Sequence, residues 1–455
     1  MWTLLFFLAC SGDGSDVTEP DPPTPTGDTG DTDTATPPPT GTTGDTAEVP
    51  TGWCAPTTNA LRFDCPATGT LRWWPADDPT RVHTAEADGS YVIWGIRSDV
   101  DTLVELPDGS LTRVVPGVLP QRIDDALMLA TGTASTAMAL PNPCEGQDLL
   151  VVDDEGRLVW YEEFQAGVAA IDITPDGTFL VLIGGARLIE VDVQGNALLN
   201  VADFEHPMHH DVSRDEDGFT YALYAERISH EGEDYVLDGL YVLDRDGAIV
   251  DDWRLYDHLP AGTLVPGERG FYWEGKFPGA IDFSHGNSVE VAPDGGLMLS
   301  FRWLHSVMKV TGGATTPQFG TVEWALAAPQ GDLVSTYQLV GDDPRFDGQH
   351  HATLDEQGRV WLFDNGEGDE VSRAMRFDLD GTDAPVGATW DHTDACPVQG
   401  AAYPTADDGV LLSCSTHGEI RELGPSETTP RFSLDLACAT GRTALLNRAV
   451  PIDDW

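Results

Sequence analysis

Short apolar runs that alternate with polar residues dominate the chain just after residue 52. Such runs occupy 71–74, 90–94 and 102–106, and turns rich in Pro, Asp and Gly separate them. A two-residue period places successive side chains on opposite faces of a strand, so each run predicts a half-buried β-strand. Residues 53–125 are therefore expected to form a small β-sandwich domain.

From about residue 145 the chain repeats one unit, in which two strands lie between a first and a second turn that contain Gly. The paired turns are 176–177 with 194–195, 217–218 with 246–247, 294–295 with 312–313, 357–358 with 380–381, and 408–409 with 424. No helical periodicity longer than about ten residues interrupts them. Six strand clusters of this kind predict an all-β fold in which residues 126–455 form a six-bladed β-propeller.

The first 52 residues carry a different pattern. An apolar run at 2–9 is shorter than the roughly 20 residues that span a bilayer, and it ends at Cys10. It resembles a bacterial lipoprotein signal, in which such a Cys becomes the lipidated N-terminus. Residues 11–52 are rich in Thr, Pro, Asp and Gly and predict a disordered tether. We expect an outer-membrane lipoprotein or a periplasmic protein, with a cleaved ordinary secretory peptide as the alternative.

Charge narrows the range of partners. The chain has 76 acidic residues against 24 Lys and Arg, and its formal net charge is -52. Only nine of the acids precede residue 53, so the folded part is itself acidic. A polyanion repels nucleic acids, which excludes a DNA- or RNA-binding protein. Only Lys276 and Lys309 are lysines, so nearly every fixed cation is an arginine, whose planar fork suits oxyanions.

Six cysteines remain after Cys10, an even number that fits disulfides in an oxidising compartment. We expect Cys54 to pair with Cys65 within the first domain and the other four to pair among themselves. None lies in a CxxC pair, so a thiolate zinc site is not predicted. The six are Cys54, Cys65, Cys144, Cys396, Cys414 and Cys438.

Histidines concentrate at the beginnings of three successive strand clusters. They are His206, His209 and His210, then His285, then His350 and His351. Equivalent positions of propeller blades point toward the same axis, so we expect the three groups to meet at the mouth of the central channel.

Amide and guanidinium groups accompany these histidines. Asn287 and Arg302 follow His285, and Arg373 follows the last histidine pair. In an acidic protein, such donors predict a specific pocket for a sulfate, phosphate or carboxylate. The alternative is that Arg302 and Arg373 pair with neighbouring carboxylates.

A set of motifs carries a resemblance to a known family. The motifs are FSHGNSV at 283–289, LSFR at 299–302, GQHHA at 348–352 and FDNG at 363–366 with Ser372-Arg373, followed by QGAA at 399–402 and LLSC at 411–414. In this order they resemble the arylsulfate sulfotransferases, bacterial six-bladed propeller enzymes with an N-terminal β-sandwich. The resemblance covers nearly the whole chain after the tether. It implies transfer of a sulfuryl group from a phenolic sulfate to a phenol, without phosphoadenosine phosphosulfate or another cofactor, through a covalent sulfohistidine.

The same resemblance assigns roles to residues. It implies His350 as the nucleophile, and neutral imidazole is competent near pH 7 because its ordinary pKa is about 6.5. His285, Asn287 and Arg302 would stabilise charge on the sulfuryl oxygens. His210 is the candidate acid or base on the phenol oxygen, and His209 competes for that role.

Two side-chain directions complete the expectation. His351 would point away from His350 if the segment is extended. Trp303, Phe346 and Tyr403 are the aromatic residues nearest in sequence to the motifs, and they are our candidates for an apolar slot that holds the phenol ring.

Other readings stay open at this stage. A surface-tethered propeller that binds a protein or glycan without catalysis needs none of this chemistry. The segment His206-x-x-His209-His210-Asp211 could also offer imidazole and carboxylate ligands to zinc or copper. Two carboxylates beside a pocket would suit a glycosidase, and this chain has many carboxylates.

Overall fold

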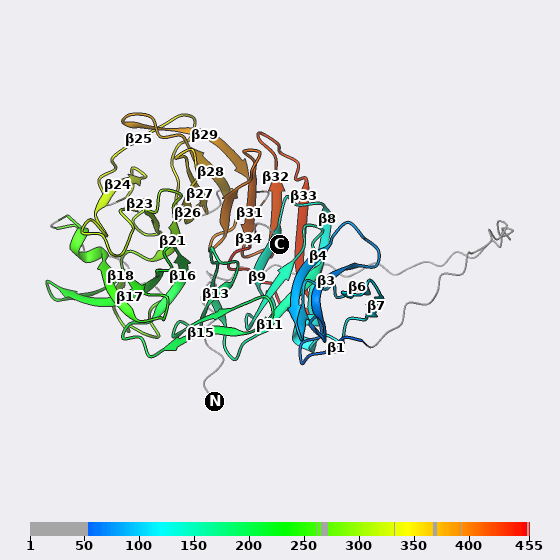
Figure 1. Cartoon of the computed structure of the whole chain (residues 1–455). Helices are drawn as coiled ribbons and strands as arrows, with labels where there is room; N and C mark the ends of the chain where they lie inside the picture. Colours follow the sequence, from blue (N-terminus) through cyan, green and yellow to red (C-terminus); the bar gives the residue numbers. More distant parts are fainter. Residues whose placement is uncertain are drawn as a thin grey trace. The chain divides into compact units, whose positions relative to one another are not determined.

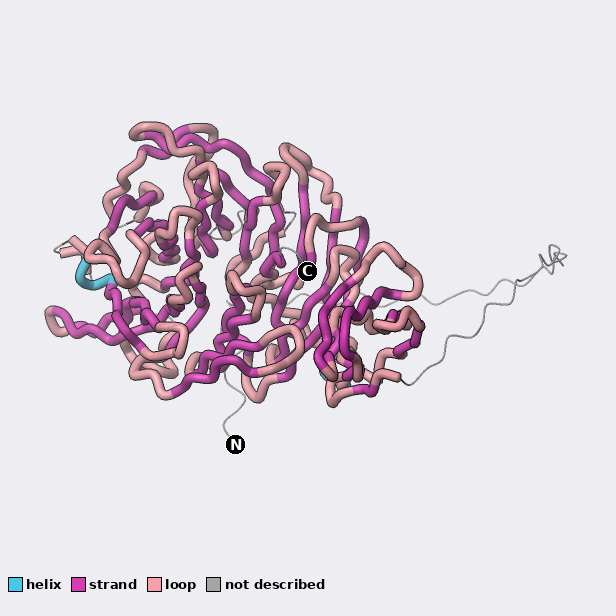
Figure 2. Tube along the Cα trace, viewed as in Figure 1, coloured by secondary structure: helices cyan, strands magenta, loops and turns pink. Residues whose placement is uncertain are grey.

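The computed structural model describes residues 53–260, 262–264, 272–331, 333–366, 371–392, 394–452 and 455. Cys10 and the expected signal and tether therefore lie outside the described residues. The described chain is all-β, with one short helix, α1 (Gln121–Asp124), and one 3-10 turn, η1 (Leu255–His258). Strands and the loops that connect them make up nearly all of the described trace in Figure 2. The all-β prediction is confirmed, and no helix in the described part is long and apolar enough to cross a membrane.

The first seven strands form two antiparallel sheets. The three-stranded sheet has the order β1 (Ala55–Pro56), β2 (Phe63–Cys65) and β5 (Tyr91–Ile93). The four-stranded sheet has the order β4 (His83–Asp88), β3 (Thr68–Pro75), β6 (Thr102–Glu105) and β7 (Leu111–Val114). Together they occupy the segment for which a sandwich is predicted. Leu71 and Trp73 of β3 lie in the same apolar core as Leu411 and Phe432 from the other end of the chain. Residues 50–455 accordingly form one compact unit.

Six further sheets follow one another along the chain, each with four strands at its centre (Figure 1). The first contains β34 (Val450–Ile452), β9 (Ala137–Pro141), β10 (Asp148–Val152) and β11 (Leu158–Glu163). The second contains β12 (Val168–Ile173), β13 (Phe179–Ile183), β14 (Arg187–Val191) and β15 (Ala197–Ala202). The third contains β16 (Met208–Arg214), β17 (Thr220–His230), β18 (Glu233–Leu243) and β19 (Ile249–Arg254), and β20 (Ile281–Asp282) pairs with β18.

The remaining three sheets lie toward the C-terminal end. The fourth contains β21 (Gly286–Val291), β22 (Leu297–Phe301), β23 (Ser306–Val310) and β24 (Val322–Ala327). The fifth contains β26 (His350–Leu354), β27 (Val360–Asp364), β28 (Arg373–Phe377) and β29 (Asp383–Asp391), with β25 (Gln338–Val340) parallel to β29. The sixth contains β30 (Ala401–Pro404), β31 (Val410–Cys414), β32 (Glu419–Leu423), β33 (Phe432–Cys438) and β8 (Ala126–Gly132).

The first strands of successive sheets contact one another in chain order. These contacts join β12 to β16, β16 to β21, β21 to β26 and β26 to β30, and β12 also contacts β9 and β34. The two chain ends share sheets, because β34 pairs with β9 and β33 pairs with β8. Side chains at the beginnings of these first strands are thereby brought together from distant parts of the sequence.

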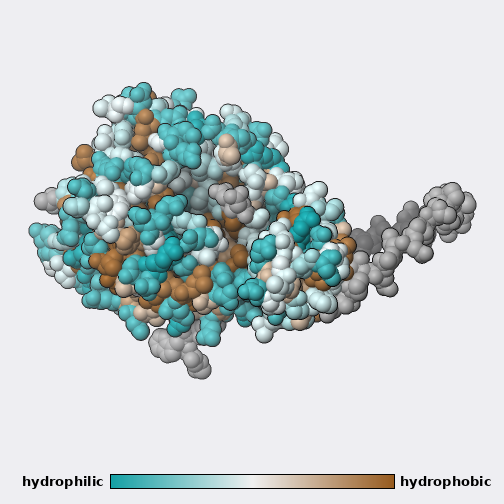
Figure 3. Space-filling model, in the orientation of Figure 1, coloured by the Kyte–Doolittle hydropathy of each residue, from teal (hydrophilic) through white to brown (hydrophobic). Residues whose placement is uncertain are grey.

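Neighbouring strands within the sheets are joined by turns of the expected kind. Gly177 and Gly218 have φ of 73° and 88°, the left-handed region in which a side chain is strained, so glycine fits these hairpin turns. The strands between the turns bury continuous apolar runs, such as β13 and β22, in which every residue is buried. A strand packed on both faces needs such a run. The outer surface is mostly hydrophilic in the view of Figure 3, which agrees with the acidic composition.

Three disulfides hold the described chain. Cys54 pairs with Cys65, Cys144 with Cys438, and Cys396 with Cys414. The predicted pairing within the first domain is confirmed, and the other four cysteines pair among themselves as expected. The Cys144–Cys438 bridge spans 294 residues and links the two ends of the chain.

Candidate active site

The histidine-bearing strands begin with an irregular step in the backbone. His210, His285 and His351 have φ of 56°, 49° and 50°, and Gln399 before β30 has 56°. The pairing register of β16, β21 and β26 shifts at the same step. A bulge re-aims side chains, and a non-glycine residue in this region costs about 1–3 kcal/mol that the surroundings must offset. Four adjacent first strands therefore begin with a strained residue, and the candidate site residues lie at these same positions.

His350, the predicted nucleophile, is buried and has a defined tautomer. Its Nδ1 lies 2.7 Å from Asn365 Oδ1 and 3.1 Å from the Gly348 carbonyl oxygen. Both partners only accept, so Nδ1 carries the proton and donates it. Nε2 is then the unprotonated nitrogen. It receives a long contact of 3.3 Å from the Gln399 N–H.

Asn365 is held in the orientation that this tautomer requires. Its Nδ2 donates to the carbonyl oxygens of Cys396 at 2.6 Å and Gln399 at 2.8 Å. With both amide hydrogens used, only Oδ1 faces His350. The side chain is fully buried, so few other arrangements satisfy its polar atoms.

The surroundings keep His350 uncharged. Burial lowers its pKa well below 6.5, and the Arg302 guanidinium and His285 lower it further, against the opposing hydrogen bond with Asn365. A protonated imidazole cannot act as a nucleophile, so this environment preserves the reactive form at neutral pH.

Arg302 supplies the positive charge beside this histidine. Its NH1 lies 3.5 Å from His350 Nδ1, its NH2 donates to the Pro397 carbonyl oxygen at 2.9 Å, and its guanidinium lies 4.7 Å from the centre of the Trp303 ring. A guanidinium in this position can attract a sulfate group.

His285 faces the same space and is backed by a carboxylate. Its Nδ1 lies 2.7 Å from Asp282 Oδ2, which also accepts a bond from Trp303 Nε1 at 3.2 Å. The carboxylate fixes which ring nitrogen points away from it. The structure therefore brings His285, Trp303 and Arg302 together as the sequence predicts.

His210 and His209, which are adjacent on β16, face different neighbours. The His210 ring lies 5.0 Å from that of His285 and 4.9 Å from that of Tyr272. His209 instead lies with Nε2 3.0 Å from Asp238 Oδ1 and packs edge-on against Trp273. The two histidines approach each other, Nδ1 to Nδ1, at 2.8 Å. His210 is thus the one that faces the other site histidine, and His209 backs it.

Charge in this region is distributed unevenly. Burial, then the neighbouring His209, His285 and His350, lower the pKa of His210 well below 6.5. Asp238 stays ionised, because bonds from His209, Ser284 and the Gly286 N–H lower its pKa despite burial. A fixed carboxylate beside His209 with a neutral His210 in front suits proton transfer on an oxygen atom.

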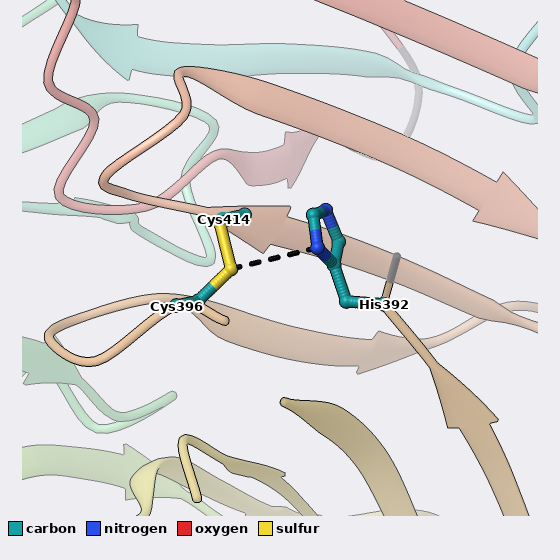
Figure 4. Close-up of side chains that lie close together, drawn as sticks. All are labelled: His392, Cys396 and Cys414. Atoms are coloured by element: carbon teal, nitrogen blue, oxygen red, sulfur yellow. Dashed lines mark hydrogen bonds between the residues drawn. A yellow bond between two sulfur atoms is a disulfide. The ribbon is translucent and has the colours of Figure 1, made fainter. Parts of the chain in front are cut away.

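The loop before β30 contacts the site with its backbone. Residues 396–399 provide the carbonyl groups that orient Asn365, the acceptor for Arg302 and the N–H near His350. The Cys396–Cys414 disulfide fixes this loop to β31, and His392 lies beside it with Nδ1 3.7 Å from Cys396 Sγ (Figure 4). These three residues are the one group among the described residues spaced for a metal. Their sulfurs are joined to each other here and are not thiolates.

Several predicted residues have other contacts. Arg373 bonds Asp364 at 3.1 Å and Asp343 at 2.9 Å together with two carbonyl oxygens, so its described partners fit the carboxylate-pairing alternative. Asn287 donates to the Gln349 carbonyl oxygen at 2.8 Å, next to His350, and thus fixes the backbone there.

The remaining candidates lie to the side of the His350 pocket. His351 contacts Glu290 at 3.1 Å and the Tyr403 ring at 4.2 Å; it turns from His350 through the bulge and not through plain strand alternation. Phe346 lies in an apolar core. His206 stacks on Tyr224 rather than joining His209 and His210.

Sequence reasoning missed the carboxylates and one aromatic residue. Asp282 precedes His285 by three residues, a spacing that could have drawn attention to it. Asp238 is 46 residues from its partner Ser284, and no local pattern marks it. Tyr272 lies in a long loop and is 48% exposed, and its ring covers both His210 and His285.

Comparisons with solved structures give only distant likenesses. A protein of unknown function from Bacteroides caccae is 10% identical, with a TM-score of 0.41 over 70% of this chain and 99% of that chain. A virginiamycin B lyase from Staphylococcus aureus is 10% identical, with a TM-score of 0.39 over 69% and 89%. BamB from Moraxella catarrhalis is 11% identical, with a TM-score of 0.35 over 71% and 89%. Likenesses this weak assign no function and no ligand.

Sequence comparison is more informative. No curated protein matches the chain. The family model of arylsulfotransferase (ASST) matches residues 120–385, which include His210, His285, Arg302 and His350. This match covers more than half of the chain and agrees with the resemblance of the motifs. The chain belongs to the arylsulfotransferase (ASST) family.

Proposed function

We propose that this protein transfers a sulfuryl group from a phenolic sulfate ester to a phenol in two steps through His350. The observation that carries the proposal is the environment of His350. It is a buried neutral imidazole whose Nδ1–H is donated to an amide, with the Arg302 guanidinium nearby, and whose unprotonated Nε2 lies 3.3 Å from the Gln399 N–H. Family membership supports the same general activity. We further propose that the six sheets are the blades of a propeller whose first strands line the site.

In the first step His350 Nε2 attacks the sulfur of the donor. The N–S bond forms as the bond between sulfur and the aryl oxygen breaks, and the electron pair stays on that oxygen. The incoming group displaces the long Gln399 N–H contact, and this N–H then donates to a sulfuryl oxygen together with Arg302. Donors placed where negative charge accumulates are typically the largest contribution to such catalysis.

The departing phenol needs a proton in this step and returns one in the next. The rings of His285 and His210 lie 5.0 Å apart, and both pack beside Tyr272. His285 in its imidazolium form, which the Asp282 carboxylate stabilises, protonates the phenol oxygen as it leaves. The same histidine then takes the proton from the acceptor phenol, whose oxygen attacks sulfur while the N–S bond breaks. Proton transfer of this kind contributes about 10²–10⁴-fold.

Aromatic residues give the pocket its preference for phenols. Tyr272 and Trp303 flank His285, with ring centres 5.0 Å and 5.7 Å from the imidazole. Flat apolar faces at this spacing favour an aryl ring in offset or edge-on packing. Of the aromatic residues suggested by the sequence, Trp303 has the placement that fits such a slot.

The proposal is tested with nitrophenyl sulfate as donor and phenol as acceptor. Wild type should release nitrophenol in proportion to added phenol, and intact-mass analysis without acceptor should find one sulfuryl group on the protein. Both signals should disappear in His350→Ala and persist in His230→Ala, a histidine at the end of β17. A folded wild-type protein that is silent with several phenols would refute the transferase and favour the non-catalytic binding propeller.

We also propose that the protein works outside the cytoplasm, anchored through Cys10. Three disulfides among the described residues support an oxidising compartment. Cells that express the full chain with labelled fatty acid should yield labelled protein, and Cys10→Ser should abolish the label. A label that persists in Cys10→Ser would disprove this anchor.

A further inference from the structure

A second group of polar and charged side chains lies beside the site histidines, largely on the first strands of the same sheets, and the reaction described above does not use it. It comprises Asp211 on β16, Glu290 on β21, His351 on β26, Tyr403 on β30 and Arg448, which lies just before β34. Arg448 and Asp211 are 4% and 1% exposed. Buried charges are retained only when they are paired and hydrogen-bonded, so this group has a defined structure.

Arg448 is the centre of the group. Its NH1 lies 2.9 Å from Asp211 Oδ2 and 3.4 Å from Glu290 Oε1, and its NH2 donates to the Asn287 carbonyl oxygen at 3.1 Å. Glu290 Oε1 also lies 3.1 Å from His351 Nε2. One guanidinium therefore ties β16 to β21 at the residues that adjoin His210 and Asn287 in the chain.

The residues that bond to Arg448 lie in the backbone segments that orient the site histidines. Asp211 follows His210 directly, and its Oδ2 also accepts the Val289 N–H at 2.9 Å. Asn287 follows His285 by two residues and holds the Gln349 carbonyl oxygen next to His350. A shift of Arg448 would thus reach His210 through the adjacent Asp211, and His350 through the hydrogen bond between Asn287 and the Gln349 carbonyl oxygen.

We propose that Arg448 is a positioning residue of this site, which holds His210 and Asn287 in place from the closing end of the chain. The inference rests on the proposed transfer function. Arg448 touches no reacting atom in the described contacts. It lies two residues before β34, which pairs with β9, so closure of the first sheet and alignment of the pocket depend on the same segment.

The electrostatics agree with this geometry. The groups that act on His210 are His209, His285, His350 and Arg448, and all of them lower its pKa in addition to burial. The Tyr272 ring packs on its open side. Burial raises the pKa of Asp211 to about 7, and the Arg448 guanidinium acts against this rise by favouring the ionised carboxylate. Removal of the guanidinium would therefore let His210 accept a proton at higher pH.

Two substitutions separate charge from geometry. Arg448→Lys keeps the positive charge, but a single ammonium does not reproduce the planar set of bonds to Asp211, Glu290 and Asn287. Arg448→Met removes the charge and keeps part of the volume. Arg214→Lys is the matched control. Arg214, at the end of β16, is also a buried arginine, and it pairs with Glu190.

The first measurement is the titration of His210 by NMR of the full chain labelled in its histidines, with the signal assigned from His210→Gln. We expect Arg448→Met to raise the pKa of His210, and Arg448→Lys and Arg214→Lys to leave it near the wild-type value. This readout needs no activity, so it tests the inference even if the transferase proposal fails. Identical His210 titrations in folded wild type and Arg448→Met would overturn the electrostatic part.

The second measurement is the steady-state rate with nitrophenyl sulfate and phenol. Small misplacements of catalytic groups are costly, so we expect Arg448→Lys to lower kcat about tenfold or more with little change in KM. Arg214→Lys should lower thermal stability and leave kcat unchanged. If Arg448→Met does not fold, Arg448→Lys still decides the matter, since wild-type kcat in that variant refutes a positioning role.

Discussion

The two sides of the pocket support their histidines with different chemistry. On one side, His350 gives its Nδ1–H to the neutral Asn365 amide and a backbone carbonyl, beside the Arg302 cation. On the other, His285 and His209 are backed by the carboxylates of Asp282 and Asp238. Both sides are buried, so the difference lies in the partner and not in exposure to water.

This difference matches two separate tasks. A carboxylate stabilises the charged imidazolium and makes the imidazole a better base, which suits a group that gains and loses a proton. A neutral amide fixes the tautomer and adds no negative charge. The imidazole that carries the sulfuryl group on Nε2 then remains a good leaving group, because a neutral amide stabilises the positive ring less than a carboxylate would. A nucleophile that must release its cargo in every cycle benefits from the weaker partner.

The largest expected effect comes from giving His350 a carboxylate partner like those of His285 and His209. Asn365→Asp keeps an acceptor for Nδ1–H, adds a negative charge and removes both Nδ2 bonds to residues 396 and 399. We expect a loss of about 10³-fold in kcat, comparable to the loss of an oxyanion-hole donor. Because the charge stabilises the sulfuryl adduct, single-turnover mass analysis should show that the adduct persists after acceptor is added.

Asn365→Ala is the comparison for that experiment, since it removes the acceptor without adding charge. The aspartate variant should be no more active than the alanine variant, and both must retain a cooperative thermal transition. Near-wild-type turnover in Asn365→Asp would show that the neutral partner is irrelevant to His350.

Asp282→Asn makes the reciprocal change with a smaller effect. His285 then loses the carboxylate that supports its proton transfer, and general acid catalysis accounts for about 10²-fold here. The loss should depend on the donor. Phenyl sulfate, whose phenol leaves poorly without a proton, should suffer more than nitrophenyl sulfate, whose phenolate leaves readily.

Parallel rate measurements with the two donors check this prediction, and Asp343→Asn on the Arg373 side is the control. An equal fall with both donors would assign Asp282 a purely structural role.

The histidines at the starts of three strand clusters predicted that these groups meet. His210, His285 and His350 do come together, whereas His206 and His351 lie elsewhere. Local alternation predicted that the chain is all-β. Both predictions depend on patterns within a few residues. The turns at Gly177 and Gly218 and the starts of β16, β21 and β26 are local features of this kind. The Cys54–Cys65 pair, eleven residues apart, was within reach for the same reason.

Long-range partners were not predictable from one sequence. Asp238 of β18 meets His209 of β16 within one sheet and the Gly286 backbone of β21 in the neighbouring sheet, and Arg448 reaches Asp211 across 237 residues. The acidic composition also hides such residues, since 76 carboxylates offer many equivalent candidates. Arg373 illustrates the opposite error: a suggestive position in a motif whose side chain is occupied by Asp364 and Asp343.

The smallest effect concerns stability rather than rate. Burial lowers the pKa of His350 in the folded protein, while the unfolded chain keeps an ordinary value near 6.5, so the unfolded chain binds the proton first as pH falls. Folding stability from this residue is therefore complete above pH 6.5 and is lost below it. Between about pH 6.5 and pH 5.5 the loss from one such histidine amounts to about 1 kcal/mol.

His350→Asn should lack this contribution, so urea unfolding at both pH values isolates it. Wild type should lose about 1 kcal/mol more than the variant over that interval. Carboxylates with raised pKa, such as Asp211, act in the opposite direction, but they are present in both proteins and cancel in the difference. If the two proteins lose equal stability, His350 is protonated in the folded state as readily as in the unfolded chain. The contrast between its amide partner and the carboxylate-backed histidines would then have no electrostatic consequence.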